Sequence, residues 1–243
     1  MSVLTRTELR LYLRDGATLF WGLAFPPVLL ALVGAVPSFR ERSADLGGAR
    51  PIDLYVPVCV AFVIGMLALS ALPSVLASYR ERGVLRRLAT TPVGPRRLVE
   101  AQLTVNAGLM LVPVVLVLVL ARLAYDVGLP EAPLAWLLAF VLTGAALLGL
   151  GVLIAAVAPS ARVATAVGST LWFPLMFFAG LWFPRESMSD ALRTASDLTP
   201  LGAGVGALQT ATEGAFPDAL HLLVLVAYAA VCGTLAVRLF RWE

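Results

Sequence analysis

The sequence predicts an all-α membrane protein with six transmembrane helices. Of its 243 residues, 60% are hydrophobic and only 14% are charged, whereas a soluble domain keeps about a quarter of its residues charged. The mean hydropathy is +0.89. Such a chain cannot cover its surface with polar groups, so lipid must be part of its solvent. Six segments are also long and apolar enough to cross the roughly 30 Å hydrocarbon core as helices.

The six predicted spans form one membrane domain over residues 1–243. They lie near 18–37, 54–78, 98–121, 133–158, 163–183 and 219–239. Because the number of spans is even, both termini face the same side of the membrane. If that side is the cytoplasm, the 18 arginines divide 12 to 6 in favour of the cytoplasm, as the positive-inside rule requires. We therefore expect a multi-pass protein of the plasma or inner membrane with both termini cytoplasmic.

A short basic helix is expected ahead of the first span. Arg6, Arg10 and Arg14 recur at intervals of four residues and share one helical face, while Leu11 and Tyr12 point broadly the other way. An amphipathic helix of this kind lies in the headgroup layer of the cytoplasmic leaflet. The alternative is a positively charged anchor that only sets the orientation of the first span.

The composition excludes most side-chain chemistry. All 18 basic residues are arginine, so the chain has no lysine for a phosphate-binding loop or a Schiff base. One histidine and two cysteines, Cys59 and Cys232, supply too few ligands for a closed His/Cys metal site. We expect no catalytic residue, no metal and no cofactor in this chain.

The cytoplasmic segment between the second and third spans carries six arginines, more than orientation requires. Leu85 and Leu88 fall with two smaller apolar residues at helical spacing, which predicts a short amphipathic helix over 80–90. Pro92 ends it, because proline biases the preceding Thr91 away from helical dihedrals. A loop that only sets topology is the alternative, and charge alone would favour it. An ordered helix with a proline stop is better explained as a docking surface.

Aromatic and methionine side chains deep in two spans are candidates for a path through the membrane. Trp172 and Met176 lie in the fifth span beside Pro174, and Phe62 and Met66 lie in the second. Such side chains can line a route for an apolar solute, although ordinary helix packing is the simpler explanation. No span carries a buried pair of ionisable side chains and no inverted repeat is visible, so neither an ion channel nor an ion-coupled transporter is expected.

The segment 184–218, between the last two spans, is neither clearly polar nor apolar enough to cross. It contains Pro184, Pro200 and Pro217 together with several glycines. Broken helical backbone at membrane depth persists only where protein or a water-filled cavity covers it. We therefore predict a re-entrant structure in two pieces on the outer side.

An intramembrane serine protease is the alternative enzyme class. Ser169 and His221 lie in different spans, but the serine is flanked as Gly-Ser-Thr instead of the Gly-x-Ser-Gly context of those enzymes. His221 lies at the outer edge of the last span beside Asp218, where a hydrated surface position is enough to explain it.

Two blocks of sequence resemble the permeases of ABC-2-type transporters. Residues 79–102 begin Tyr-Arg-Glu-Arg-Gly-Val-Leu and continue through Leu-Ala-Thr-Thr-Pro-Val, like the cytoplasmic signature of this family. Residues 174–209 resemble its second block, including the Phe-Pro and Pro-Leu pairs. Val84 replaces a common threonine, and Gly202 replaces a frequent tyrosine. The resemblance covers nearly the whole chain and is nearest to the daunorubicin-resistance branch.

The resemblance implies the membrane subunit of an ATP-driven exporter, which is not an enzyme by itself. The second permease would be another copy of this chain or a homologue, and two copies of a separate subunit would bind ATP and magnesium. The absence of lysine agrees, because this chain cannot supply the ATP-binding lysine. The implied cargo is an amphipathic drug-like molecule or lipid. Exporters of polysaccharide or haem-related cargo share the architecture. Membrane lipid is an expected partner and nucleic acid is not.

In this family the helix mapped to 80–90 couples the ATPase to the spans. The corresponding candidate coupling residues are Glu81, Arg82, Gly83, Leu85, Arg86, Arg87, Leu88, Thr91 and Pro92. We expect Leu85 and Leu88 to fill an apolar groove of the ATPase while charged side chains pair at its rim, because buried anchors outweigh rim charges. The re-entrant pair is implied to cap the outer side of the pathway.

Overall fold

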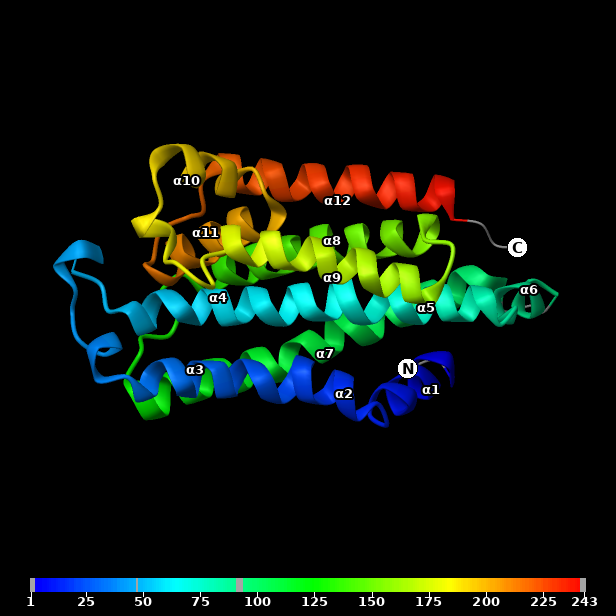
Figure 1. The fold of residues 1–243 in the computed structure, drawn as a ribbon, viewed down its shortest axis with the longest axis horizontal. Helices are drawn as coiled ribbons and strands as arrows, with labels where there is room; N and C mark the ends of the chain where they lie inside the picture. Colours follow the sequence, from blue (N-terminus) through cyan, green and yellow to red (C-terminus); the bar gives the residue numbers. More distant parts are fainter. Residues whose placement is uncertain (1–2, 47, 91–93, 241–243) are drawn as a thin grey trace.

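The computed structural model describes residues 3–46, 48–90 and 94–240, which contain helices and turns but no strand. Figure 1 shows most of the helices running side by side along the long axis of the molecule. In the described part of the chain, five helical stretches are long and apolar enough to cross a membrane. They are Pro51–Glu81, Arg96–Tyr125, Pro133–Val157, Ala161–Phe178 and Ala219–Leu239.

The first predicted span, near 18–37, has a shorter apolar stretch than the other five. It consists of α2 (Gly16–Leu19), the π-helical turn η1 (Phe20–Ala24) and α3 (Phe25–Ala35), which follow one another without a break. Its apolar stretch, Phe20–Ala35, falls in the range of 10–17 residues, below the roughly 20 residues that a straight crossing needs. The sixth crossing therefore stays a prediction.

Two π-helical turns in the described residues stand just ahead of prolines. η1 precedes Pro26, and η4 (Leu67–Ala71) precedes Pro73. Proline has no N–H to donate to the carbonyl four residues earlier, so the hydrogen bonds shift by one residue. The N–H of Leu72, for example, bonds to the carbonyl of Leu67. Such turns are frequent at functional sites.

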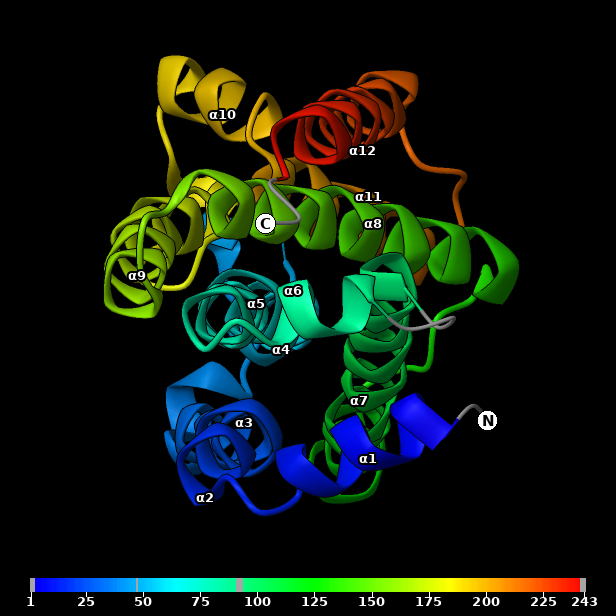
Figure 2. The same ribbon diagram turned by 90° about the vertical axis from the view of Figure 1, so that its right-hand side faces the viewer.

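The second span is the centre of the bundle. It consists of α4 (Pro51–Met66), η4 and α5 (Leu72–Glu81), and its apolar part is 78% buried within the chain, against 17–50% for the other four long spans among the described residues. Figure 2, which looks along the bundle, shows it between two layers. One layer holds α3 and α7 (Gly94–Tyr125), and the other holds α8 (Pro133–Val157) and α9 (Ala161–Phe178).

Two glycines let α8 and α9 approach the central π turn closely. A Cβ on Gly151 would overlap the carbonyl oxygen of Ala68, and a Cβ on Gly168 would overlap that of Leu69. Pro73 has no N–H, so the carbonyl of Leu69 lacks its usual donor four residues later. The Cα–H of a glycine can approach this carbonyl instead. The backbone contact therefore requires glycine at both positions.

The prediction of one continuous helix over 80–90 is wrong. Its first two residues belong to the last turn of α5, and a separate short helix, α6 (Val84–Ala89), follows. Gly83 between them has a left-handed backbone with φ of 68°, a conformation that glycine adopts at little cost. The expected stop at Thr91 and Pro92 lies outside the described residues.

The outer segment between α9 and the last span contains two helices and a 3-10 turn. They are η5 (Arg185–Ser187), α10 (Asp190–Asp197) and α11 (Pro200–Thr212), and α11 is buried along most of its length against α8 and α12 (Ala219–Leu239). α9 itself ends at Phe178, before the expected end of the fifth span at 183. How deep this segment lies in the membrane stays a prediction.

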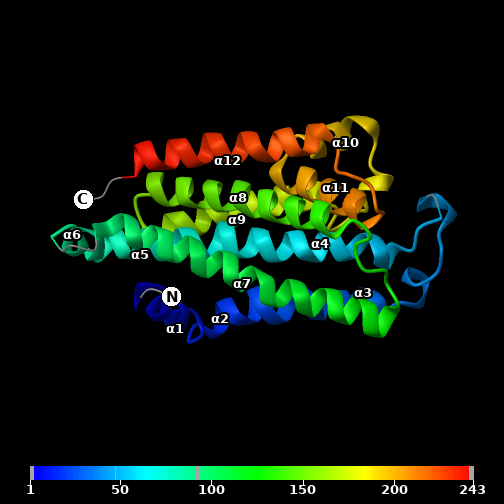
Figure 3. The same cartoon turned by 180° about the vertical axis from the view of Figure 1, so that it is seen from behind.

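The elements expected to be cytoplasmic gather toward one end of the molecule. Figures 1 and 3 show α1 (Val3–Tyr12), α6 and the end of α12 on that side. At the opposite end lie α10 and the loop that contains η2 (Pro37–Phe39) and η3 (Ala44–Leu46). Figure 3 also shows α7 running from beside α5 to beside α3, so α7 closes that face of the bundle.

Candidate functional site

An apolar cavity of about 580 Å³ opens between the first helical segment, the second span and α9. Its lining residues are Trp21, Phe25, Leu29, Phe62, Met66, Ser70, Ser169, Trp172, Phe173, Leu181 and Trp182. Three of the four candidate path residues, Phe62, Met66 and Trp172, therefore share one cavity. The fourth, Met176, is 0% exposed and packs in the core, so its side chain has no surface for a solute to contact.

The aromatic part of this wall is continuous. Consecutive ring centroids lie between 4.9 and 6.4 Å apart along the series Trp21, Phe25, Phe62, Trp172, Phe173 and Trp182. Phe62 and Trp172 meet edge to face with an interplanar angle of 87°, a preferred arrangement for aromatic pairs. Such a wall offers a large apolar contact area with few hydrogen-bonding groups.

Few polar groups face the cavity. Ser70 and Ser169 bring hydroxyls from η4 and α9, and the described lining includes no ionisable side chain. Trp172 contributes an indole N–H that is buried and has no hydrogen-bond partner among the described residues. Its nitrogen packs over Gly65 of α4, where an added Cβ would lie 3.2 Å away. The cavity is thus suited to apolar groups that carry little charge.

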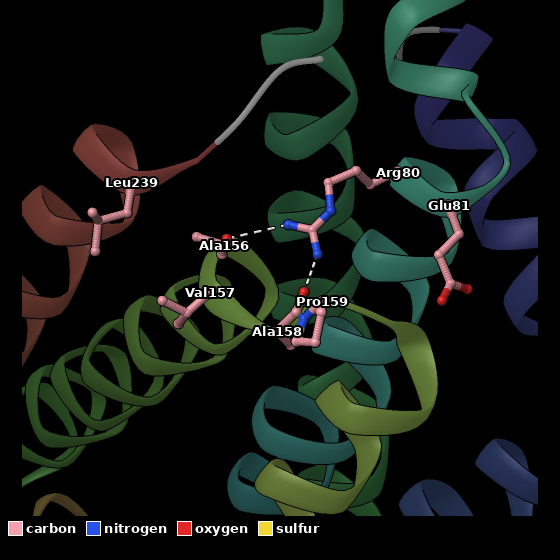
Figure 4. Close-up of a pocket in the computed structure, with 7 residues that line it drawn as sticks. All are labelled: Arg80, Glu81, Ala156, Val157, Ala158, Pro159 and Leu239. Atoms are coloured by element: carbon pink, nitrogen blue, oxygen red, sulfur yellow. Dashed lines mark hydrogen bonds between the residues drawn. The ribbon is translucent and has the colours of Figure 1, made fainter.

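At the end of the bundle where α6 lies, Arg80 caps the C-terminus of α8. Its guanidinium donates to the carbonyls of Ala155 at 3.0 Å and Ala156 at 3.2 Å, and also to that of Ala158. Figure 4 shows the side chain reaching across to this helix end. The last carbonyls of a helix have no partner within the helix and carry its negative dipole end, so a cation is well placed here.

Glu81, in the same turn of α5, binds the N-terminus of the next helix, α9. Its Oε1 accepts a hydrogen bond from the backbone N–H of Ala161 at 3.1 Å, at the start of α9. Both residues border a hollow of about 550 Å³ that also involves Leu239 of α12. Figure 4 shows that hollow between the ends of three helices. The Arg-Glu pair of the sequence signature thus holds the turn between α8 and α9 from both sides.

The candidate coupling residues divide between two faces of α6. Arg82, Arg86 and Arg87 are exposed. Leu85 is only 1% exposed, and the half-buried Leu88 packs against the same core. The expected insertion of Leu85 into a groove of a second protein therefore does not fit, because its own chain already covers it. α6 presents arginines to the outside.

α1 is fastened to the second and third spans by a buried carboxylate. Its three expected interfacial arginines are exposed: Arg6, Arg10 and Arg14. Between them Glu8 is buried, and its Oε2 accepts hydrogen bonds from the Tyr79 hydroxyl at 2.7 Å and from Gln102 Nε2 at 2.5 Å. Desolvation raises the pKa of Glu8, and the hydrogen bond from Tyr79 opposes this effect. The sequence alone does not reveal this contact, because the three side chains come from three segments that are distant along the chain.

A polar cluster joins the two outer pieces to the last span. Arg185 forms an ion pair with Asp197 and donates from Nε to Ser196 Oγ at 3.0 Å. Ser196 in turn donates to the carbonyl of Phe178 at 2.6 Å, and His221 Nε2 lies 3.0 Å from Asp197 Oδ1. Burial lowers the pKa of Arg185, against the opposing charge of Asp197. The cluster ties four segments together at the end of the bundle opposite α6.

His221 is not the hydrated surface residue that the sequence indicated. It is 7% exposed, because α11 carries Gly206 where it faces the imidazole and an added Cβ there would lie 3.0 Å from Nδ1. Ser169 lines the apolar cavity, whereas His221 lines a separate outer hollow. The structure thus does not bring the two protease candidates together. Among the described residues, no group of three or more His, Cys, Asp or Glu side chains is placed to hold a metal ion.

Comparison with known proteins agrees with this architecture of long apolar helices. A comparison with curated proteins finds no match. The family described as ABC-2 type transporter matches residues 1–212, which is most of the chain. The chain therefore belongs to the ABC-2 type transporter family, as a multi-pass membrane permease subunit of an ABC transporter that works with an ATP-binding subunit and is not itself a catalytic enzyme.

Proposed function

We propose that this permease exports an amphipathic drug-like molecule or lipid from the cytoplasm or the inner leaflet. The observation that carries the proposal is the continuous aromatic wall of the cavity, which has no ionisable residue in its described lining. Its volume of about 580 Å³ lies within the range of roughly 300–1,000 Å³ typical of small-molecule sites. A polysaccharide would need many hydrogen-bonding groups along its path, and this wall offers few.

In this proposal the working unit contains two permeases, either two copies of this chain or this chain with a homologue, and two ATP-binding subunits that hold ATP and magnesium. The absence of lysine in this chain supports a separate motor. We place the complex in the plasma or inner membrane, with six spans per permease, both termini cytoplasmic and the outer segment capping the pathway. By its two sequence blocks the chain resembles permeases of the daunorubicin-resistance branch, which supports a drug or lipid cargo.

The ATP-binding subunit docks, we infer, on the exposed face of α6. Arg82, Arg86 and Arg87 supply this face, and together with Glu81 and Gly83 they belong to the family's signature block. Leu85 and Leu88 pack α6 against α5 and α7 on its opposite face. The proposed docking is therefore led by charge, with the leucines fixing the position of the helix.

Ligand-stimulated ATP hydrolysis tests the cargo proposal. The complex with its ATP-binding subunit is placed in lipid nanodiscs, and a panel of apolar, cationic amphipathic and sugar ligands is screened. Phe62→Ala and Trp172→Ala are expected to change which ligands stimulate hydrolysis, because each removes aromatic contact area from the wall. Phe183→Ala is the matched control, since that aromatic residue is exposed and lies outside the cavity lining. Stimulation by sugars alone, or an unchanged ligand profile in both cavity variants, contradicts the proposal.

A further inference from the structure

The last turn of α5 contacts both sides of the turn between α8 and α9. Arg80 binds the final carbonyls of α8, and Glu81 binds the backbone N–H of Ala161 at the start of α9. The α8–α9 turn is therefore held by side chains of the second span.

These contacts lie directly beside α6. The N–H of Gly83 bonds to the carbonyl of Arg80 at 3.0 Å, and the N–H of Arg87 bonds to the carbonyl of Gly83 at 3.1 Å. α6 and the last turn of α5 are thus joined through consecutive backbone hydrogen bonds. A displacement of α6 reaches Arg80 and Glu81 directly.

The two helix ends depend on these side chains to different degrees. The carbonyls that Arg80 binds belong to Ala155, Ala156 and Ala158, which are buried, so Arg80 supplies the hydrogen bonds that water supplies at an exposed helix end. At the start of α9, Ser160 already accepts a hydrogen bond from the N–H of Val163 at 3.2 Å, as an N-cap residue does. Arg80 therefore has a structural role as well as its place beside α6, and a measurement of movement separates the two.

We propose that Arg80 and Glu81 are positioning residues that convey the displacement of α6 to α9 and so reshape the apolar cavity. The inference rests on the proposed function, because it requires ATP-driven movement of α6. α9 starts beside Glu81 and carries Ser169, Trp172 and Phe173 of the cavity wall. A hydrogen-bonded helix transmits a shift of its first turn along its length, so these side chains move with it.

A distance measurement tests whether α6 and α9 move as one unit. Spin labels are placed by Thr90→Cys and Val163→Cys in the intact complex, after Cys59 and Cys232 have been replaced by alanine. The distance between the labels is expected to stay constant when ATP binds, and to change in the Arg80→Gln variant, because the two helices are then uncoupled. If the distance responds to ATP in the same way in the unaltered complex and in the Arg80→Gln variant, the inference is overturned.

The functional readout separates this inference from the proposed function. Arg80→Gln is expected to leave ATP-binding subunit association and basal hydrolysis unchanged while ligand stimulation falls at least about fivefold, the lower end of typical coupling effects. Arg162→Gln removes an exposed cation from the first turn of α9 and should leave stimulation unchanged. If Arg80→Gln does not insert, Arg80→Lys carries the same expectation, because lysine lacks the planar fork. Full stimulation in the arginine variant overturns the inference alone, whereas no stimulation of the unaltered complex overturns the proposed function.

Discussion

Gly168 shows how one missing side chain decides the packing of two spans. Any Cβ at this position would overlap the carbonyl of Leu69 in the central π turn. We expect Gly168→Ala to lower stability by about 1–3 kcal/mol, the usual cost of overpacking a close contact. The apparent Tm in detergent measures this effect.

The matched control is Gly108→Ala in α7. An added Cβ at Gly108 meets no atom within 4 Å, and alanine reduces the freedom of the unfolded chain. We expect an unchanged or slightly higher Tm, corresponding to at most about 1 kcal/mol. Equal losses of Tm at the two glycines would show that close approach is not the reason for Gly168.

Glu8 makes the stability of the protein depend on pH. Burial raises its pKa above the ordinary value of 4.5, so the folded state holds this proton more tightly than the unfolded state does. Its contribution to stability is therefore largest below pH 4.5 and declines as the pH rises through the raised pKa. The variant Glu8→Gln lacks this titration and keeps an oxygen that can accept from Tyr79 or Gln102.

The pH series compares the apparent Tm of the two proteins. We expect Glu8→Gln to gain stability relative to the unaltered protein as the pH rises from 4.5 toward neutral. Other carboxylates titrate in both proteins and cancel in the difference. A Tm difference that does not vary with pH would contradict the assignment.

α6 is the element whose orientation most changes the functional interpretation. Its exposed arginines and its buried Leu85 predict two different defects: weaker association for the arginines and lower stability for the leucine. Arg86→Gln with Arg87→Gln should weaken association of the ATP-binding subunit roughly three- to tenfold at low salt, and less at high salt, because exposed charges contribute little individually and are screened. Leu85→Ala should lower stability by about 2–4 kcal/mol through the cavity it leaves.

Association measured at two salt concentrations, together with thermal unfolding, separates the two effects. Arg162→Gln serves as the control for lost positive charge outside α6. If Leu85→Ala weakened association while leaving Tm unchanged, Leu85 would contact the partner after all. Salt-independent binding in the double arginine variant would remove the charge-led docking proposal.

At the scale of the whole molecule, the topology makes a direct prediction. The arginine bias, together with the gathering of α1, α6 and the end of α12 toward one end, predicts that this end faces the cytoplasm. A single cysteine introduced by Thr90→Cys should resist an impermeant reagent in intact cells and react after permeabilisation. Cysteine at exposed Ser189 should show the opposite pattern. If position 90 is labelled in intact cells, the predicted orientation is wrong.

The positions of the long spans were predictable from the sequence alone. α8 and α12 occupy nearly the predicted ranges 133–158 and 219–239, because hydropathy and segment length are local properties that the bilayer reads directly. The family could likewise be identified from two short blocks. The break at Gly83 was missed, because the surrounding apolar spacing looks the same whether or not one residue adopts a left-handed turn.

The arrangement of the candidate site depended on tertiary packing. Phe62 and Trp172 meet in one cavity whereas Met176, in the same helix as Trp172, faces the core. Leu85 is covered by its own chain, and Arg80 finds its partners in the backbone of α8. Helical periodicity tells which side chains share a face, but only the packing of segments distant in sequence decides whether protein, lipid, a solute or a partner covers that face.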